Sequence, residues 1–358
     1  MKELEGPFRI NGTAYTKEEL LTYAEKQMDN PAAIHWEKDL YSFILDFLNP
    51  QIPLLQKSSG TTGDPKTISL SRAAMLNSAS NTLEFFQLEP GNKALLCLPV
   101  NFIAGKMMVV RAMLGGMELL TIEPGGNPLI NLDEEVHFAA MVPLQMYEAL
   151  KTPTKLSLIE KLILGGGEIH SGLKEQIGML KDTEVFETFA MSETYSHFAV
   201  KKLNGEYPED TFTIMEGVSI DIDPRSCLVV DIKGITNGPV VSNDLVELSG
   251  PRHFRWMGRA DYIIKSGGMK IIPEILEKRI DEKLGIESIF LGIKDLRFGE
   301  KMVMVLEKAT FLQHPGLKND LEKILAKHEF PKSIEFIERF PRNRSYKIDR
   351  REIAKILS

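Results

Sequence analysis

The segment KSSGTTGDPK, residues 57–66, lies between a strand predicted for residues 52–56 and a helix predicted to begin near Ser71. Its glycines let backbone N–H groups turn toward an anion without a Cβ in the way. Hydroxyls and lysines add further donors and charge, so the segment is predicted to bind phosphate. The alternative is a flexible surface loop. The residues predicted to contact phosphate are Ser58, Ser59, Gly60, Thr61, Thr62, Gly63 and Lys66.

This loop differs from the common nucleotide-binding P-loop, whose pattern is G-x-x-x-x-G-K-[ST]. Gly63 is followed by Asp64, and no hydroxyl follows a Gly-Lys pair where it could hold Mg²⁺. The segment therefore does not meet the P-loop pattern.

Length and composition indicate a soluble protein of two domains or one large one, because the chain has 358 residues of ordinary apolar and charged content. No apolar run reaches the ~18–20 residues of a membrane helix, and the first residues lack the apolar core of a signal peptide. Cys97 and Cys227 lie in strand-like runs without metal-ligand spacing. We expect buried thiols, a cytoplasmic location and no membrane insertion.

Charge is spread unevenly along the chain. Residues 262–358 contain 20 Lys and Arg against 15 Asp and Glu, whereas the whole chain has a net charge of −7. An acidic body followed by a basic tail suggests two units. The tail lacks the aromatic-plus-basic pattern of RNA-binding domains, so no nucleic-acid partner is predicted.

The order of predicted elements indicates an α/β fold. Residues 1–50 are predicted to be helical, and strands then alternate with helices as far as residue 189, which predicts a parallel, doubly wound sheet. From residue 219 short strands indicate an antiparallel β subdomain, followed by a small α+β unit. We predict a large domain at 1–260 and a small C-terminal domain at 261–358.

Three further stretches carry chemistry. Residues 188–193, at a strand end, combine an aromatic ring with hydroxyls and one carboxylate, Glu193, which could hold Mg²⁺ beside phosphates. Asp244 could accept from two sugar hydroxyls, with Arg259 nearby, and residues 341–347 form a basic loop. Each has an ordinary structural explanation, such as a helix-terminal carboxylate, a turn residue or a solvated lysine.

Taken together and in this order, the four stretches resemble the motifs of the adenylate-forming acyl- and aryl-CoA ligases. The phosphate loop matches from Ser58 to Lys66, the aromatic-Gly-x-Thr/Ser-Glu motif matches 189–193, and Gly-Arg-x-Asp-x-x-Ile-Lys-x-x-Gly matches 258–268. The C-terminal Gly-Lys-x-x-Arg matches 347–350, with Tyr346 in place of glycine. The resemblance covers the chain from about residue 52 to its end.

This resemblance implies a two-step reaction with ATP, Mg²⁺ and CoA, in which a carboxylate becomes an acyl-adenylate and then a thioester. The implied catalytic residues are Lys347, Ser192 and Glu193, the last binding Mg²⁺. The small domain is implied to rotate about Asp261 between the steps. The implied adenine and ribose residues are Gly165, Gly166, Gly167, Thr188, Phe189, Ala190, Asp244 and Arg259, and the implied CoA-side residues are Lys265, Gly267 and Gly268.

The acid is suggested by residues 98–111, which resemble the o-succinylbenzoate–CoA ligase branch of menaquinone (vitamin K2) biosynthesis. Arg111 would meet the second, non-reacting carboxylate of a small aromatic acid, with Phe102 and Ser196 also at the acid. A snorkelling or internally paired Arg111 is the alternative. Other aryl- or acyl-CoA ligases and a non-catalytic nucleotide-binding homologue remain open, as does a homodimer.

The chain also departs from the family pattern. The phosphate loop begins early, so the N-terminal region is shortened. Ala190, Asn243 and Tyr346 stand where glycine is usual.

Overall fold

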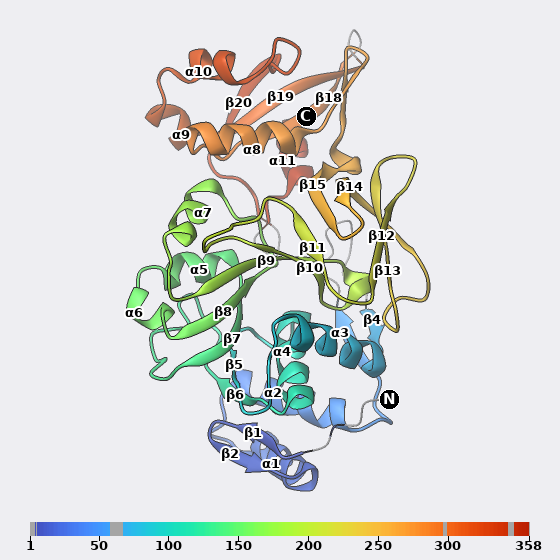
Figure 1. The fold of residues 1–358 in the computed structure, drawn as a ribbon. Helices are drawn as coiled ribbons and strands as arrows, with labels where there is room; N and C mark the ends of the chain where they lie inside the picture. The colour runs from blue at the N-terminus through green and yellow to red at the C-terminus, as the bar shows by residue number, and fades with distance from the viewer. Residues whose placement is uncertain (1–3, 5, 58–66, 296–298, 343–346, 358) are drawn as a thin grey trace. The chain divides into compact units, whose positions relative to one another are not determined.

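The computed structural model describes residues 4, 6–57, 67–295, 299–342 and 347–357 (Figure 1). The phosphate loop predicted at residues 58–66 lies outside these described residues. Contacts within the chain define two compact units, which we describe separately. The first comprises Met1–Gly166, Gln176–Ser219 and Asp231–Val240, and the second comprises Gly167–Glu175, Ile220–Val230 and Val241–Ser358. The predicted domain boundary at residue 261 stays a prediction.

The first unit is built on a sheet whose central strands are parallel, as the alternation of strands and helices predicted. Its strands are nearly continuous apolar runs, which suits a sheet covered on both faces. The mixed α/β class is therefore confirmed. In spatial order the strands are β11 (Phe212–Ile214), β10 (His197–Lys202), β9 (Glu184–Ala190), β8 (Ile159–Leu164), β7 (Val136–Met141), β5 (Lys93–Leu96), β6 (Glu118–Thr121), β1 (Phe8–Ile10) and β2 (Thr13–Tyr15).

The helices of the first unit follow their sequence signals. Ser71 caps the third helix by accepting a hydrogen bond from the Ala74 N–H at 3.3 Å. The fourth helix is apolar almost all round, and its side chains belong to the core. The helices are α1 (Lys17–Asp29), α2 (His35–Leu48), α3 (Arg72–Phe85), α4 (Ile103–Gly115), α5 (Pro143–Ala149), α6 (Pro153–Leu156) and α7 (Ser171–Gly178), the last shared with the second unit.

The prediction of a purely helical segment at residues 1–50 is wrong. A β-hairpin, β1–β2, precedes α1 and α2, and β1 adds to the parallel sheet beside β6. The turn is Asn11-Gly12, with φ of 46° and 79°. Positive φ at both central residues matches the twist of a tight hairpin, which explains why Asn-Gly favours this turn.

A two-stranded antiparallel ribbon, β3 (Leu54–Lys57) and β4 (Thr67–Leu70), flanks the position of the predicted phosphate loop. Arg72 fixes the entry to this ribbon. Its guanidinium donates to the carbonyl oxygens of Asp46, Phe47, Asn49 and Ile52 at 2.5–3.0 Å. A cation at the C-terminus of α2 also interacts favourably with the helix dipole.

The second unit contains an antiparallel ribbon and a small mixed sheet with helices, as predicted for this part of the chain. Parts of β12 (Val218–Ile222) and β13 (Cys227–Ile232) belong to it, and β14 (Val240–Gly250) pairs with β15 (His253–Arg259). The small sheet has the order β17 (Met269–Ile271), β16 (Ile264–Ser266), β19 (Gly299–Glu307) and β18 (Ile289–Asp295), with β20 (Ser333–Ile337) parallel to β19. Its helices are α8 (Pro273–Leu284), α9 (Lys308–Gln313), α10 (Leu317–Ile324) and α11 (Arg350–Ile356).

None of the helices in the described ranges has both the length and the apolar character that a bilayer span requires.

Candidate functional site

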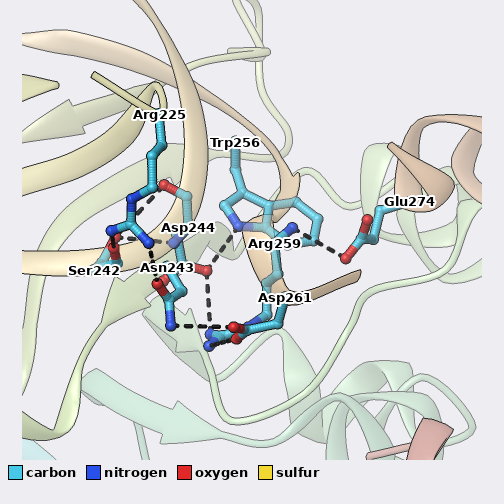
Figure 2. Close-up of polar contacts among 8 residues, drawn as sticks. All are labelled: Arg225, Ser242, Asn243, Asp244, Trp256, Arg259, Asp261 and Glu274. Atoms are coloured by element: carbon cyan, nitrogen blue, oxygen red, sulfur yellow. Dashed lines mark hydrogen bonds and ion pairs between the residues drawn. The ribbon is translucent and has the colours of Figure 1, made fainter. Parts of the chain in front are cut away.

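Asp244 and Arg259 face each other across the β14–β15 ribbon of the second unit (Figure 2). Asp244 Oδ1 accepts a hydrogen bond from Trp256 Nε1 at 3.1 Å and lies 3.5 Å from Arg259 Nη1. Because the antiparallel register makes these two residues direct partners, one hairpin assembles the pair that was predicted from a single stretch of the sequence. The Asp244 carboxylate is therefore held by two neighbouring side chains.

The side chains around this pair form a polar network (Figure 2). Arg259 Nη2 donates to Asp261 Oδ2 at 3.0 Å, and Asn243 Nδ2 donates to Asp261 Oδ1 at 3.3 Å. Asn243 in turn accepts from Arg225 Nη1 at 3.1 Å. Asn243 therefore contributes a bridge that the usual glycine could not make.

Residues before the predicted hinge are held by Glu274 of α8. Its Oε1 accepts from the Arg259 N–H at 3.1 Å, while Oε2 is buried without a hydrogen-bond partner. Desolvation raises the Glu274 pKa to about 7. Gly258 has a φ of 150°, and a Cβ there would lie 2.6 Å from Glu274 Oε2. Only glycine fits this position.

Lys347 belongs to the same unit as Asp244 and Arg259. Desolvation lowers the pKa of Lys347, and the positive charge of Arg259 lowers it further. The negative charges of Asp244 and Glu168 act in the opposite direction and raise this pKa. The predicted catalytic cation is thus within electrostatic range of the predicted ribose-binding residues.

The segment that carries Lys347 is fixed at both ends. Arg342 and Ile348 form an antiparallel bridge, and the Asp349 N–H donates to the Pro341 carbonyl at 2.8 Å. Beyond it, Arg350 makes a bidentate pair with Glu277 and stacks over the Tyr262 ring at 4.8 Å. Arg350, the last residue of the C-terminal motif, therefore anchors this segment.

In the first unit, the ends of β8 and β9 approach closely at Gly165. Thr188 Oγ1 donates to the Leu164 carbonyl at 2.9 Å. A Cβ on Gly165 would lie 2.5 Å from Thr188 Oγ1. Gly166 follows with a φ of 80°. The glycine run therefore permits a close approach of two strand ends, where ligands bind in such sheets.

Replacing Gly165 by alanine is expected to lower the free energy of unfolding by about 1–3 kcal/mol, because the new Cβ overlaps Thr188 Oγ1. Urea denaturation measures this change. Gly172→Ala is the matched control, since a Cβ there meets nothing within 4 Å. Adding Thr188→Ala to Gly165→Ala should restore much of the loss, and strictly additive effects would contradict the overlap.

Phe189 and Ala190 end β9. The Phe189 ring packs edge-on against Phe198 and Phe212, with centroids 5.7 and 5.4 Å apart. These rings hold Phe189 in place. Its predicted role as an adenine platform, and the place of Ala190 beside it, stay predictions.

Ser192 and Glu193 are exposed on a single 3₁₀ turn, Ser192–Thr194. Thr194 Oγ1 ties this turn together through Met191 and Ser196, and Tyr195 takes a left-handed φ of 61°. An exposed carboxylate on a fixed turn fits Mg²⁺, which takes one or two carboxylates from protein and completes its shell with water and phosphate. The described ranges contain no cluster of three His, Cys, Asp or Glu ligands.

Arg111 is buried in the core of the first unit, with 2% of its surface exposed. Its Nη2 donates to Ser196 Oγ, while its Nε has no hydrogen-bond partner. Desolvation lowers its pKa to about 9. Among the described residues no carboxylate pairs with it, which is rare for a buried guanidinium. The structure thus brings together the predicted acid-binding residues Arg111 and Ser196.

His197 extends this polar cluster. Its Nδ1 lies 3.3 Å from Ser196 Oγ, and its Nε2 lies 3.4 Å from Thr82 Oγ1. Burial, and then the nearby Arg111 charge, lower its pKa well below the usual value, so the ring is neutral. A neutral imidazole can accept from Ser196, which leaves the serine available to Arg111.

The remaining predicted residues have clear positions. Phe102 precedes α4 and is 55% exposed. Gly267 and Gly268 form the β16–β17 turn with φ of 59° and 80°, and Lys265 lies on β16. Their roles toward the acid and CoA stay predictions.

Trp256, Glu274 and Thr82 were missed by sequence reasoning. The spacing of the motifs gives no sign of these contacts, because the residues reach the site through strand pairing or helix packing.

The sequence matches a known family. The sequence profile of the AMP-binding enzymes matches residues 48–229, so the chain belongs to this family, which includes the adenylate-forming CoA ligases that use ATP and CoA. A crystal structure of an acyl-CoA synthetase (AMP-forming)/AMP-acid ligase II-like protein from Dyadobacter fermentans is 33% identical. It covers 94% of this chain and 98% of its own, with a TM-score of 0.63.

Within the family, the chain is similar to 2-succinylbenzoate–CoA ligases. The protein of that name from Bacillus cytotoxicus is 25% identical over 84% of this chain and 69% of its own length. The o-succinylbenzoate CoA synthetase from Bacillus subtilis, solved with its acyl-adenylate intermediate, is 21% identical. It covers 84% of this chain and 68% of its own, with a TM-score of 0.69, which shows a common fold.

Proposed function

We propose that this protein is an ATP-dependent acid–CoA ligase that acts on o-succinylbenzoate in menaquinone biosynthesis. The observation that carries the choice of acid is Arg111, a buried guanidinium with no carboxylate partner among the described residues. A dicarboxylic acid would supply the missing anion, whereas a monocarboxylic acid would leave the charge unpaired.

In the first step, a carboxylate oxygen of the acid attacks the α-phosphorus of ATP. The bond to the bridging oxygen breaks, and pyrophosphate leaves with that electron pair. Lys347 neutralises negative charge at the α-phosphate and the attacking carboxylate, aided by Ser192. Residues 58–66 hold the outgoing phosphates. Positioning and charge stabilisation account for the catalysis, because no covalent bond to the protein is needed.

In the second step, the CoA thiolate attacks the acyl carbon and AMP leaves. The small domain turns about Asp261 so that Gly267 and Gly268 face CoA, because one site must serve two reactions in turn. Asp244 and Arg259 hold the ribose, while Phe189 and the glycines at 165–167 border the adenine.

Mg²⁺, held by Glu193, would neutralise phosphate charge. The exposed position of this carboxylate supports the assignment.

The test is ATP–pyrophosphate exchange with a panel of acids, with CoA consumption as a second readout. Exchange that is strongest with o-succinylbenzoate supports the proposal. Stronger exchange with benzoate or fatty acids would replace it with another acyl- or aryl-CoA ligase. Absence of exchange with every acid would support a non-catalytic nucleotide-binding protein.

A further inference from the structure

The segment that follows the glycine run is held by residues of the C-terminal part of the chain, within the second unit. The Ser171 N–H donates to Asp281 Oδ2 at 2.7 Å, and Ser171 Oγ donates to Asp281 Oδ1 at 2.9 Å. Asp281 therefore accepts from a donor at the N-terminus of α7, where an acid is favoured. This cap comes from α8, 110 residues away.

A second contact lies beside the first. His170 Nε2 is 3.2 Å from Glu287 Oε1, and Arg342 Nη2 donates to both oxygens of Glu287 at 3.0 and 2.9 Å. Glu287 thus joins His170 to Arg342. Arg342 also forms the backbone bridge with Ile348, next to Lys347.

We propose that Asp281, Glu287 and Arg342, together with His170 and Ser171, form a latch that positions Lys347 for the adenylation step. The latch ties residues 167–171, which border the proposed adenine site, to the base of the Lys347 segment. It rests on the proposed function, since it concerns how Lys347 is presented to the nucleotide. The five side chains are positioning residues that do not contact the reacting atoms.

The latch acts on only one of the two half-reactions. Contacts between residues 167–171 and the small domain favour the arrangement in which Lys347 is near Asp244 and Arg259. An interaction that is present in only one arrangement shifts the population toward that arrangement. It therefore cannot assist a half-reaction that requires a different arrangement. Loss of the latch should therefore slow adenylation and leave thioester formation unchanged or faster.

The latch should weaken as pH rises. The hydrogen bond to Glu287 raises the pKa of His170, and the nearby carboxylates of Glu168 and Asp281 act in the same direction, while burial opposes them. When the latch is open, His170 has its ordinary pKa of roughly 6.5. Below that pH the protonated ring stabilises the closed latch fully, and this stabilisation is lost as pH rises through the higher pKa that His170 has when the latch is closed. Arg342 stays charged throughout this range and faces the same carboxylate.

The first experiment measures both half-reactions in Asp281→Asn and Glu287→Gln enzymes. The expected result is a fall of about three- to tenfold in ATP–pyrophosphate exchange, because partly exposed ion pairs are worth little more. Thioester formation from supplied acyl-adenylate should not fall. Glu282→Gln is the matched control, since Glu282 also lies on α8 and pairs with Lys278. Equal losses in both half-reactions would overturn the proposal.

The second experiment measures, without requiring turnover, how often the protein adopts the arrangement in which the latch contacts are formed. Dyes on Met179→Cys and Leu312→Cys report the arrangement by energy transfer, because both sites are exposed and the two native cysteines are buried. A shift in the transfer distribution in Glu287→Gln, relative to Glu282→Gln, supports the latch even if no acid supports exchange. An unchanged distribution in both latch variants would overturn it. Absence of exchange in the unaltered enzyme would instead overturn the proposed function.

His170→Gln provides the pH readout. It keeps a neutral donor but removes the titration, so the fall in exchange between pH 6 and 8 should be smaller than in the unaltered enzyme. An identical pH profile in the two enzymes would exclude His170 from the latch.

Discussion

Replacing Lys347 by alanine is expected to lower the rate of acyl-adenylate formation by about 10²–10³-fold, the usual cost of removing one group that stabilises transition-state charge. Thioester formation from supplied acyl-adenylate should stay within about threefold, because the α-phosphate has then already reacted. Single-turnover measurements of the two half-reactions make this comparison. The expectation follows from the electrostatic proximity of Lys347 to Asp244 and Arg259.

Lys355→Ala is the control for this experiment. Lys355 is an exposed lysine of α11 that pairs with Glu352, so its loss changes net charge equally without touching the site. Comparable losses in both half-reactions of Lys347→Ala would exclude the assigned role.

Replacing Arg111 by methionine is expected to have opposite effects on activity and stability. The kcat/KM for o-succinylbenzoate should fall by about 100-fold or more, because the second carboxylate then enters an apolar site unpaired. The free energy of unfolding should rise by about 1–4 kcal/mol, since apolar residues often replace buried charges with a gain in stability. Kinetics on mono- and dicarboxylic acids and thermal unfolding measure the two effects.

The pKa of Arg111 specifies when this stability effect applies. Burial lowers the folded-state pKa to about 9, below the unfolded value of more than ~12. Below pH 9 the guanidinium is charged in both states, so its desolvation cost is fully present, and the cost is relieved only as pH rises through 9. Near neutral pH, o-succinylbenzoate should raise the melting temperature of the unaltered protein more than that of Arg111→Met.

Arg111→Lys separates charge from geometry in this experiment. Lysine keeps the cation but loses the planar fork that can bind a carboxylate and Ser196 together. Partial activity in Arg111→Lys and little in Arg111→Met is expected. Full activity on o-succinylbenzoate in Arg111→Met would disprove the dicarboxylate assignment.

The regular parts of the fold were predictable from local patterns. For example, α8 begins at Pro273 and ends before Gly285, which has a φ of 65°. Both are strong local signals. The hairpin at Asn11-Gly12 was missed although its turn residues are also informative. Its strands have three residues each, too short for alternation to be visible, and pairing of β1 with β6 stabilises them from a distance.

The candidate site was predictable as a set of motifs but not as an arrangement. Asp244 and Arg259 are partners because of one hairpin register, including irregularities that no local pattern gives. Arg111 and Ser196 are 85 residues apart and meet through a side-chain hydrogen bond between α4 and the residue that precedes β10. Residues 58–66, which gave the first signal in the sequence, lie outside the described structure.

The two anchors of the Lys347 segment also have a consequence for its chemistry. Arg342, which precedes Lys347, is held by Glu287, and Arg350, which follows it, is held by Glu277, so Lys347 has an anchored residue on each side. The effective concentration of a tethered group depends on the length and stiffness of its tether. In the proposed reaction, two glutamates outside the set of reacting groups therefore set the local concentration of the Lys347 ammonium at the substrate. Changes at Glu277 or Glu287 should act like dilution of the catalytic group, with its intrinsic reactivity unchanged.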